Sequence, residues 1–163
     1  MSELLIVFHS LTGGTRQMAE AAAAGAREEV GIAVRLLAAA RAGPEDVLAA
    51  RGYIFATPEN LAAMAGMMKD FFDRSYYPVL DRVAGRPYGT LVCAGSDGEN
   101  AVRQIARIAT GWRLRPVADP VIVRTRAQTA EAIMAPKIIP PDGLAKCREL
   151  GLSIATGLAM GIF

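Results

Sequence analysis

The chain opens with a short, continuous apolar run, then a small polar loop and an alanine-rich segment, and this order of elements recurs along it. Residues 4–8 are all apolar, as in a central parallel strand that is covered on both faces. Residues 16–29 are rich in alanine and contain no proline, which predicts a helix. Strands that alternate with helices form a parallel sheet with helices on both faces.

The same alternation continues to the end of the chain. We expect further strands at residues 32–37, 52–57, 90–94 and 114–123, and further helices at residues 44–50, 61–74, 100–110 and from about 142. Pro116 and Pro120 interrupt the last strand, which suits a sheet edge. Residues 124–140 read as a loop. The S-x-x-E pattern from Ser96 to Glu99 predicts a capping box for the helix at residues 100–110. The expected fold is one three-layer α/β domain over residues 1–163, with a doubly wound, five-stranded parallel sheet.

Composition excludes several classes of protein. The 163 residues are 52% apolar and 21% charged, enough for a core that needs no disulfide or metal. Cys93, Cys147 and the single histidine, His9, form no metal-binding pattern. Two reduced thiols indicate the cytoplasm. The apolar runs at both ends are shorter than a membrane span, and residues 150–163 read as the end of a core-facing helix.

Charge is distributed unevenly. The net charge is +2, but residues 86–126 hold seven arginines against Asp97, Glu99 and Asp119. We interpret this excess as a solvated surface, and the alternative is attraction of an anionic substrate such as NAD(P)H. Nucleic-acid binding is disfavoured because the arginines do not form a run interleaved with aromatic residues.

The loop after the first strand reads Ser10-Leu11-Thr12-Gly13-Gly14-Thr15 and leads into a helix. A helix N-terminus offers free N–H groups and positive potential to an anion, and glycines let the backbone fold closely around it. The loop lacks G-x-G-x-x-G, G-x-x-x-x-G-K-[ST] and any nearby lysine, which disfavours a dinucleotide-type fold and an NTPase. It suits a phosphate monoester held by hydrogen bonds. The plainer alternative is a turn that caps the helix.

This loop resembles the [TS]-x-T-G-x-T phosphate loop of flavodoxins and related FMN-binding proteins. Thr57-Pro58-Glu59-Asn60 and the following residues 64–74 resemble the T-P-x-x…G-x-[ML]-K-x-F-x-D-R stretch of the NAD(P)H-dependent FMN reductase and quinone reductase branch of the flavodoxin-like superfamily. Ala94-Gly95-Ser96-Asp97-Gly98 follows the fourth strand, where that family contacts the flavin ring. The resemblance extends to about residue 123 and implies the flavodoxin-like strand order 2-1-3-4-5, with three loops around one ligand. The implied cofactor-binding residues are Ser10, Thr12, Gly13, Gly14, Thr15, Thr57, Pro58, Glu59, Asn60, Ala94, Gly95, Ser96, Asp97 and Gly98.

The resemblance implies an FMN-dependent oxidoreductase that uses NAD(P)H to reduce a quinone or another small electron acceptor. No catalytic side chain is expected, because the flavin carries the chemistry. One alternative is an electron-carrier flavodoxin, although those carriers are usually acidic and this chain is slightly basic. Another is a domain that binds flavin weakly or not at all, since the loop after the third strand has no aromatic residue to stack on the ring. Tyr76, Tyr77 or a partner subunit would then have to supply one. The resemblance also favours a homodimer or homotetramer.

Overall fold

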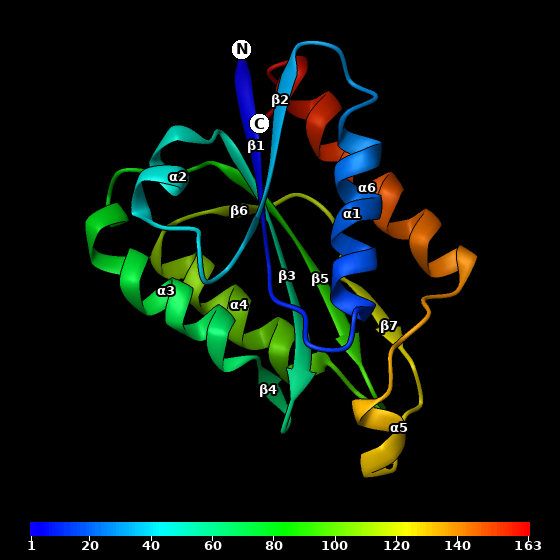
Figure 1. Ribbon diagram of the computed structural model, residues 1–163. Coiled ribbons are helices and arrows are strands. Elements are labelled where there is room, and N and C mark those ends of the chain that lie inside the picture. The colour runs from blue at the N-terminus through cyan, green and yellow to red at the C-terminus, as the bar shows by residue number, and fades with distance from the viewer.

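The computed structural model describes residues 1–163 as one sheet with helices on both faces (Figure 1). The central strands pair in the order β2-β1-β3-β5, and β6 and β7 both pair with β5. All of these pairs are parallel, and only β4 runs antiparallel to its neighbour β3. The strands are β1 Ser2–Phe8, β2 Ile32–Ala38, β3 Gly52–Asn60, β4 Ala63–Met64, β5 Pro87–Ala94, β6 Arg115–Pro116 and β7 Val121–Arg124. The predicted fold class and strand order are confirmed.

The helices divide between the two faces of the sheet (Figure 1). One face carries α2 Pro44–Ala49, α3 Gly66–Val79 and α4 Glu99–Gly111, and the other carries α1 Gly14–Ala26 and α6 Pro141–Ala159. A short helix, α5 Ala130–Met134, lies near the carboxyl ends of the strands. The α6 helix begins one residue before the expected start, and its buried residues Leu150, Ile154 and Ala155 face the core as predicted.

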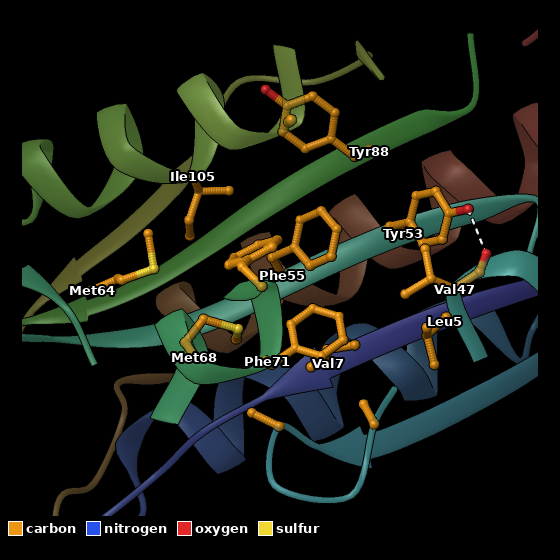
Figure 2. Packing of buried hydrophobic residues seen from close by; sticks show 14 of the residues in the cluster. Leu5, Val7, Val47, Tyr53, Phe55, Met64, Met68, Phe71, Tyr88 and Ile105 are labelled. Carbon is orange, nitrogen blue, oxygen red and sulfur yellow. Dashed lines mark hydrogen bonds between the residues drawn. The ribbon is translucent and has the colours of Figure 1, made fainter. Parts of the chain in front are cut away.

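Most of the buried aromatic side chains lie in the core on the α2–α3–α4 face of the sheet. In the first core the Phe55 ring packs edge-on against Phe72, with ring centroids 5.0 Å apart, and lies beside Phe71 (Figure 2). In the second core, α1 contributes buried alanines, which allow α6 to pack close to it: Ala19, Ala22, Ala23 and Ala26. The small residues on α1 thus decide how tightly the two helices pack.

The expected helix at residues 61–74 begins later and ends later. Leu61 and Ala62 adopt left-handed backbone angles, with φ of 51° and 62°. They reverse the chain, so that β4 folds back on the end of β3 before α3 starts at Gly66. The helix then continues to Val79 through Pro78. The sequence predicted a helix here but not the left-handed turn that delays its start.

Two further expectations were wrong. The Ser96–Glu99 capping box does not form, because the N-cap of α4 is Gly98 with a φ of 93° and no side-chain hydrogen bond. The last strand is split into β6 and β7 around the prolines, and the predicted loop at residues 124–140 contains the last residue of β7 and all of α5.

Cys93 and Cys147 are buried and unpaired. Burial raises the pKa of Cys147 to about 12, so this thiol stays neutral in the core. No group of His, Cys, Asp and Glu side chains is arranged to hold a metal ion. Among the helices, none is both long and apolar enough to cross a membrane.

Arg86 was expected on the solvated surface, but its guanidinium is tied to the end of α2. Its Nη1 atom donates to the carbonyl oxygen of Leu48 at 2.9 Å and to Tyr53 Oη at 3.0 Å. Tyr53 Oη in turn donates to the carbonyl oxygen of Val47 at 2.7 Å (Figure 2). The last carbonyls of a helix lack partners within the helix, and here a cation satisfies them.

We expect Arg86→Met to destabilise the protein by about 2 kcal/mol, because it leaves these carbonyls without their charged donor. For a chain of this size that corresponds to a fall in Tm of roughly 4–8 °C in thermal unfolding followed by circular dichroism. Arg82→Met removes the same charge from an exposed arginine whose side chain makes one long hydrogen bond, of 3.5 Å, to the carbonyl oxygen of Pro78. It should shift stability by less than about 0.5 kcal/mol. Equal effects of the two substitutions would contradict a specific role for Arg86.

Candidate functional site

A cavity of about 420 Å³ opens where β1, β3 and β5 end, at the point where ligands of such sheets bind. The loops that follow these three strands meet around it, as the sequence predicted. Ten of the predicted site residues line the cavity: Ser10, Thr12, Gly14, Thr15, Pro58, Glu59, Asn60, Ala94, Gly95 and Ser96. The remaining four, Gly13, Thr57, Asp97 and Gly98, do not line it.

Gly13 and Thr57 support the loops from behind. Gly13 is the N-cap of α1 with a φ of 92°, a left-handed conformation that suits glycine, and its N–H donates to Ser10 Oγ at 3.2 Å. Thr57 is fully buried, and its Oγ1 accepts a hydrogen bond from the N–H of Ala65 at 3.0 Å. Both residues therefore fix loop shape instead of facing the cavity.

Glu59 connects two of the loops. Its Oε2 atom accepts a hydrogen bond from the N–H of Gly98 at 2.6 Å, at the N-terminus of α4. A carboxylate is stabilised by the positive end of a helix. Asp97 accepts from the N–H of Glu99 at 3.2 Å at the same helix end. The loop after β3 is thus anchored to the loop after β5 on one side of the cavity.

The first turn of α1, which follows the loop at residues 10–14, carries an unsatisfied hydroxyl. Thr15 is 1% exposed, and its Oγ1 has no hydrogen-bond partner. A buried polar group without a partner costs free energy, and such groups are rare in native proteins. Thr15 lies in the first turn of α1, where free N–H groups also point outward. A ligand with several acceptor oxygens would satisfy all of these donors.

Sequence reasoning missed a fourth wall of the cavity, formed by residues 125–137. This segment contributes Thr125, Ala127, Gln128, Ile133, Met134 and Lys137 to the lining. The N–H of Thr125 donates to the carbonyl of Ala94 at 2.8 Å, and that of Arg126 donates to the carbonyl of Gly95 at 2.8 Å. The segment has no periodic pattern and little regular structure, so nothing in the sequence assigned it to the site.

Gln17 links the far end of this segment to the loop at residues 10–15. Its Nε2 donates to the carbonyl of Lys137 at 2.7 Å and to that of Gly13 at 3.0 Å. Its Oε1 accepts from the N–H of Ile139 at 3.0 Å. The N–H of Lys137 also donates to the carbonyl of Thr12 at 2.9 Å. One side-chain amide therefore holds residues 137–139 against the N-terminus of α1.

The rim of the cavity is apolar and contains no aromatic ring. Leu11, Leu61, Ile133 and Met134 all line it and are each at least half exposed. Tyr76 and Tyr77 do not line it, and Tyr76 stacks on Trp112 with ring centroids 5.9 Å apart. Neither tyrosine therefore supplies an aromatic ring that could stack on a flavin in this cavity.

Residues 4–128 match the model of the NADPH-dependent FMN reductase family. The chain belongs to this family. It is 38% identical over 96 residues to a protein of Aquifex aeolicus named flavodoxin, covering 59% of this chain and 50% of that one. It is 37% identical over 95 residues to an NAD(P)H dehydrogenase (quinone) of Acidithiobacillus ferrooxidans, covering 46% of this chain and 48% of that one. The chain thus spans about half the length of these curated relatives.

Solved structures show the same fold at lower identity. A flavodoxin from the domain Archaea superposes with a TM-score of 0.78 at 20% identity, covering 96% of this chain and 99% of the other. A flavodoxin, WrbA-like protein from Agrobacterium tumefaciens gives a TM-score of 0.76 at 20% identity, covering 98% and 99%.

The region that matches the FMN reductase family contains all three predicted loops and the start of the fourth wall. Ile133, Met134 and Lys137 lie beyond residue 128, where that match ends. This FMN reductase family member therefore completes its cavity with residues that the family match does not include.

Proposed function

We propose that the protein binds FMN in this cavity and uses it to pass electrons from NAD(P)H to a small acceptor such as a quinone. The observation that best supports this is the buried Thr15 hydroxyl, which has no partner and lies at the N-terminus of α1. A phosphate offers acceptor oxygens for that hydroxyl and for the free N–H groups of the same turn. The family match independently favours FMN as the molecule that carries this phosphate.

The residues present fit such a cofactor. Ser10, Thr12 and Thr15 and the backbone of their loop would hold the phosphate, and the loops after β3 and β5 would hold the ring system. A volume of about 420 Å³ lies within the range of small-molecule sites. Gly95 lets the loop after β5 approach the fourth wall, since a Cβ there would lie 2.9 Å from the carbonyl oxygen of Ala127.

Bound FMN would supply the electron transfer, and the chain's own residues would bind, orient and shield it. Only three titratable side chains line the cavity, and none is placed to act as a nucleophile. The Glu59 carboxylate is engaged by the N–H of Gly98. Burial raises the pKa of the Cys93 thiol, although the charge of Lys137 opposes the shift, so the thiol is protonated near neutral pH. The third group, Lys137, is a cation.

The apolar rim favours a small apolar acceptor. Leu11, Leu61 and Met134 expose apolar surface where an acceptor would approach, which suits a quinone ring.

An electron-carrier role is the second candidate, supported by the similarity to a protein named flavodoxin. The two buried, unpaired thiols favour the cytoplasm as the location of the protein. We also expect the protein to form a homodimer or homotetramer.

The proposal predicts that purified protein mixed with FMN shows a perturbed visible flavin spectrum and oxidises NADH or NADPH when a benzoquinone is added. The measurement is the absorbance of the flavin and of the nicotinamide, with FMN alone as the blank. FMN binding without NAD(P)H oxidation across several acceptors would contradict the reductase and favour the carrier. Absence of FMN binding would overturn both and leave a domain without flavin.

A further inference from the structure

Lys137 is the only cationic side chain that lines the cavity, and no carboxylate neutralises it. It takes part in none of the ion pairs of the protein. The one acidic residue of the lining, Glu59, is engaged by the N–H of Gly98 instead. The charge of Lys137 is therefore available to a ligand.

The Lys137 ammonium lies against the phosphate loop. Its Nζ donates to Thr12 Oγ1 at 3.4 Å and to two carbonyl oxygens of its own segment, Ile133 at 2.7 Å and Ala135 at 2.6 Å. These three acceptors are neutral and use the three N–H groups of the ammonium without cancelling its charge, so a phosphate would replace the longest contact, the one to Thr12. The backbone of residue 137 is fixed by Thr12 and Gln17, as described above.

Gly14 makes this approach possible. A Cβ at Gly14 would lie 3.3 Å from Lys137 Cβ and 2.7 Å from Cys93 Sγ. A larger residue would push the lysine segment away from the loop. The glycine-rich loop thus serves two purposes, since it leaves room for an anion and for the cation beside it.

Lys137 brings a second positive group to the N-terminus of α1, and the carbonyl oxygens of Ile133 and Ala135 at the end of α5 hold it there. The N-terminus of a helix carries partial positive charge, so a cation beside α1 is repelled and an anion is attracted. The buried Thr15 hydroxyl at the same helix end also lacks a hydrogen-bond acceptor. A phosphate with about two negative charges would accept hydrogen bonds from the Thr15 hydroxyl, from the N–H groups of the α1 N-terminus and from the Lys137 ammonium.

We propose that Lys137 is the cationic ligand of the cofactor phosphate, delivered from a segment outside the family match. The inference rests on the FMN binding proposed above. It implies that much of the preference for FMN over riboflavin, which has the same ring system but no phosphate, comes from this one side chain. It also implies that FMN binding weakens as salt is added, because salt screens the attraction.

The test compares three variants of the full chain by flavin fluorescence titration with FMN and with riboflavin, at low and high salt. Lys137→Met should raise the Kd for FMN by about 10- to 100-fold and flatten its salt dependence. Riboflavin should bind within about twofold of the original protein, because it makes no phosphate contact. Lys137→Arg should retain most of the FMN affinity. Lys146→Met, which removes an exposed lysine on α6, is the matched control and should change neither Kd.

Two outcomes would overturn the inference. An FMN Kd that is unchanged in Lys137→Met overturns it. FMN and riboflavin affinities that fall together also overturn it, since Lys137 would then only hold the segment in place. Thermal unfolding without flavin shows whether each variant is folded, and Lys137→Arg keeps the test valid if the methionine variant is not. If the original protein binds no FMN, the proposed function fails instead, and the two failures are thus distinguishable.

Discussion

Replacing Thr15 by valine should stabilise the flavin-free protein while weakening its binding of FMN. The substitution removes a buried hydroxyl that has no partner and keeps the shape of the side chain. Relief of that unsatisfied group should raise the free energy of unfolding by about 1 kcal/mol. Loss of a hydrogen bond to a charged phosphate should raise the Kd for FMN by roughly 10- to 100-fold. The two effects have opposite signs because the hydroxyl is useful only to a ligand.

Ser75→Ala provides the matched control. Ser75 is the other buried hydroxyl without a partner, and it lies in α3 away from the cavity lining. Its removal should also stabilise the protein but leave the Kd for FMN unchanged. Urea unfolding without flavin and fluorescence titration with FMN measure the two quantities. A Thr15→Val protein that is less stable without flavin, or that binds FMN as before, would show that the hydroxyl has another role.

Gly151→Ala should destabilise the protein by about 3 kcal/mol, which is a large effect for the addition of one methyl group. A Cβ at Gly151 would overlap the backbone of Ala22, and one at Gly25 would overlap the backbone of Arg148. These are backbone atoms of the facing helix, so α1 and α6 must move apart to accept the methyl group. The expected fall in Tm is roughly 6–12 °C for a chain of this size.

Gly66→Ala is the control for this second prediction. Gly66 begins α3, and a Cβ there would meet nothing within 4 Å. Alanine favours a helix over glycine, so this change should be neutral or stabilise by up to about 1 kcal/mol. Thermal unfolding by circular dichroism compares the two glycine variants directly. A Gly151→Ala protein as stable as Gly66→Ala would contradict the close packing of α1 and α6.

The sequence was sufficient for the sheet and for three of the four walls of the cavity. Apolar runs such as residues 4–8 marked the strands, and short loops at their ends marked where a ligand binds. Local sequence patterns failed where a residue far away in the chain makes the hydrogen bond that a nearby residue was expected to make. Glu59, not Ser96, accepts from the N-terminus of α4, and no spacing along the chain reveals that contact.

Lys137 shows the same limit most clearly. The loop at residues 10–15 has no lysine nearby in sequence, and the prediction of a phosphate held by hydrogen bonds followed from that. The fold brings a lysine to Thr12 across 125 positions of the chain. A single lysine in a segment without periodicity carries no signal of its own, because hydrogen bonds to Gln17 and Thr12, far away in the chain, decide where it lies.

The proline-broken strand at the edge of the sheet also bears on aggregation. Pro116 ends β6 and Pro120 precedes β7, so neither strand continues past its proline, and each is short. An unbroken edge strand would present a row of free N–H and C=O groups on which a strand of another copy, or a misfolded chain, could grow. Proline has no N–H to donate to such a ladder. This edge is therefore a poor template for fibril growth.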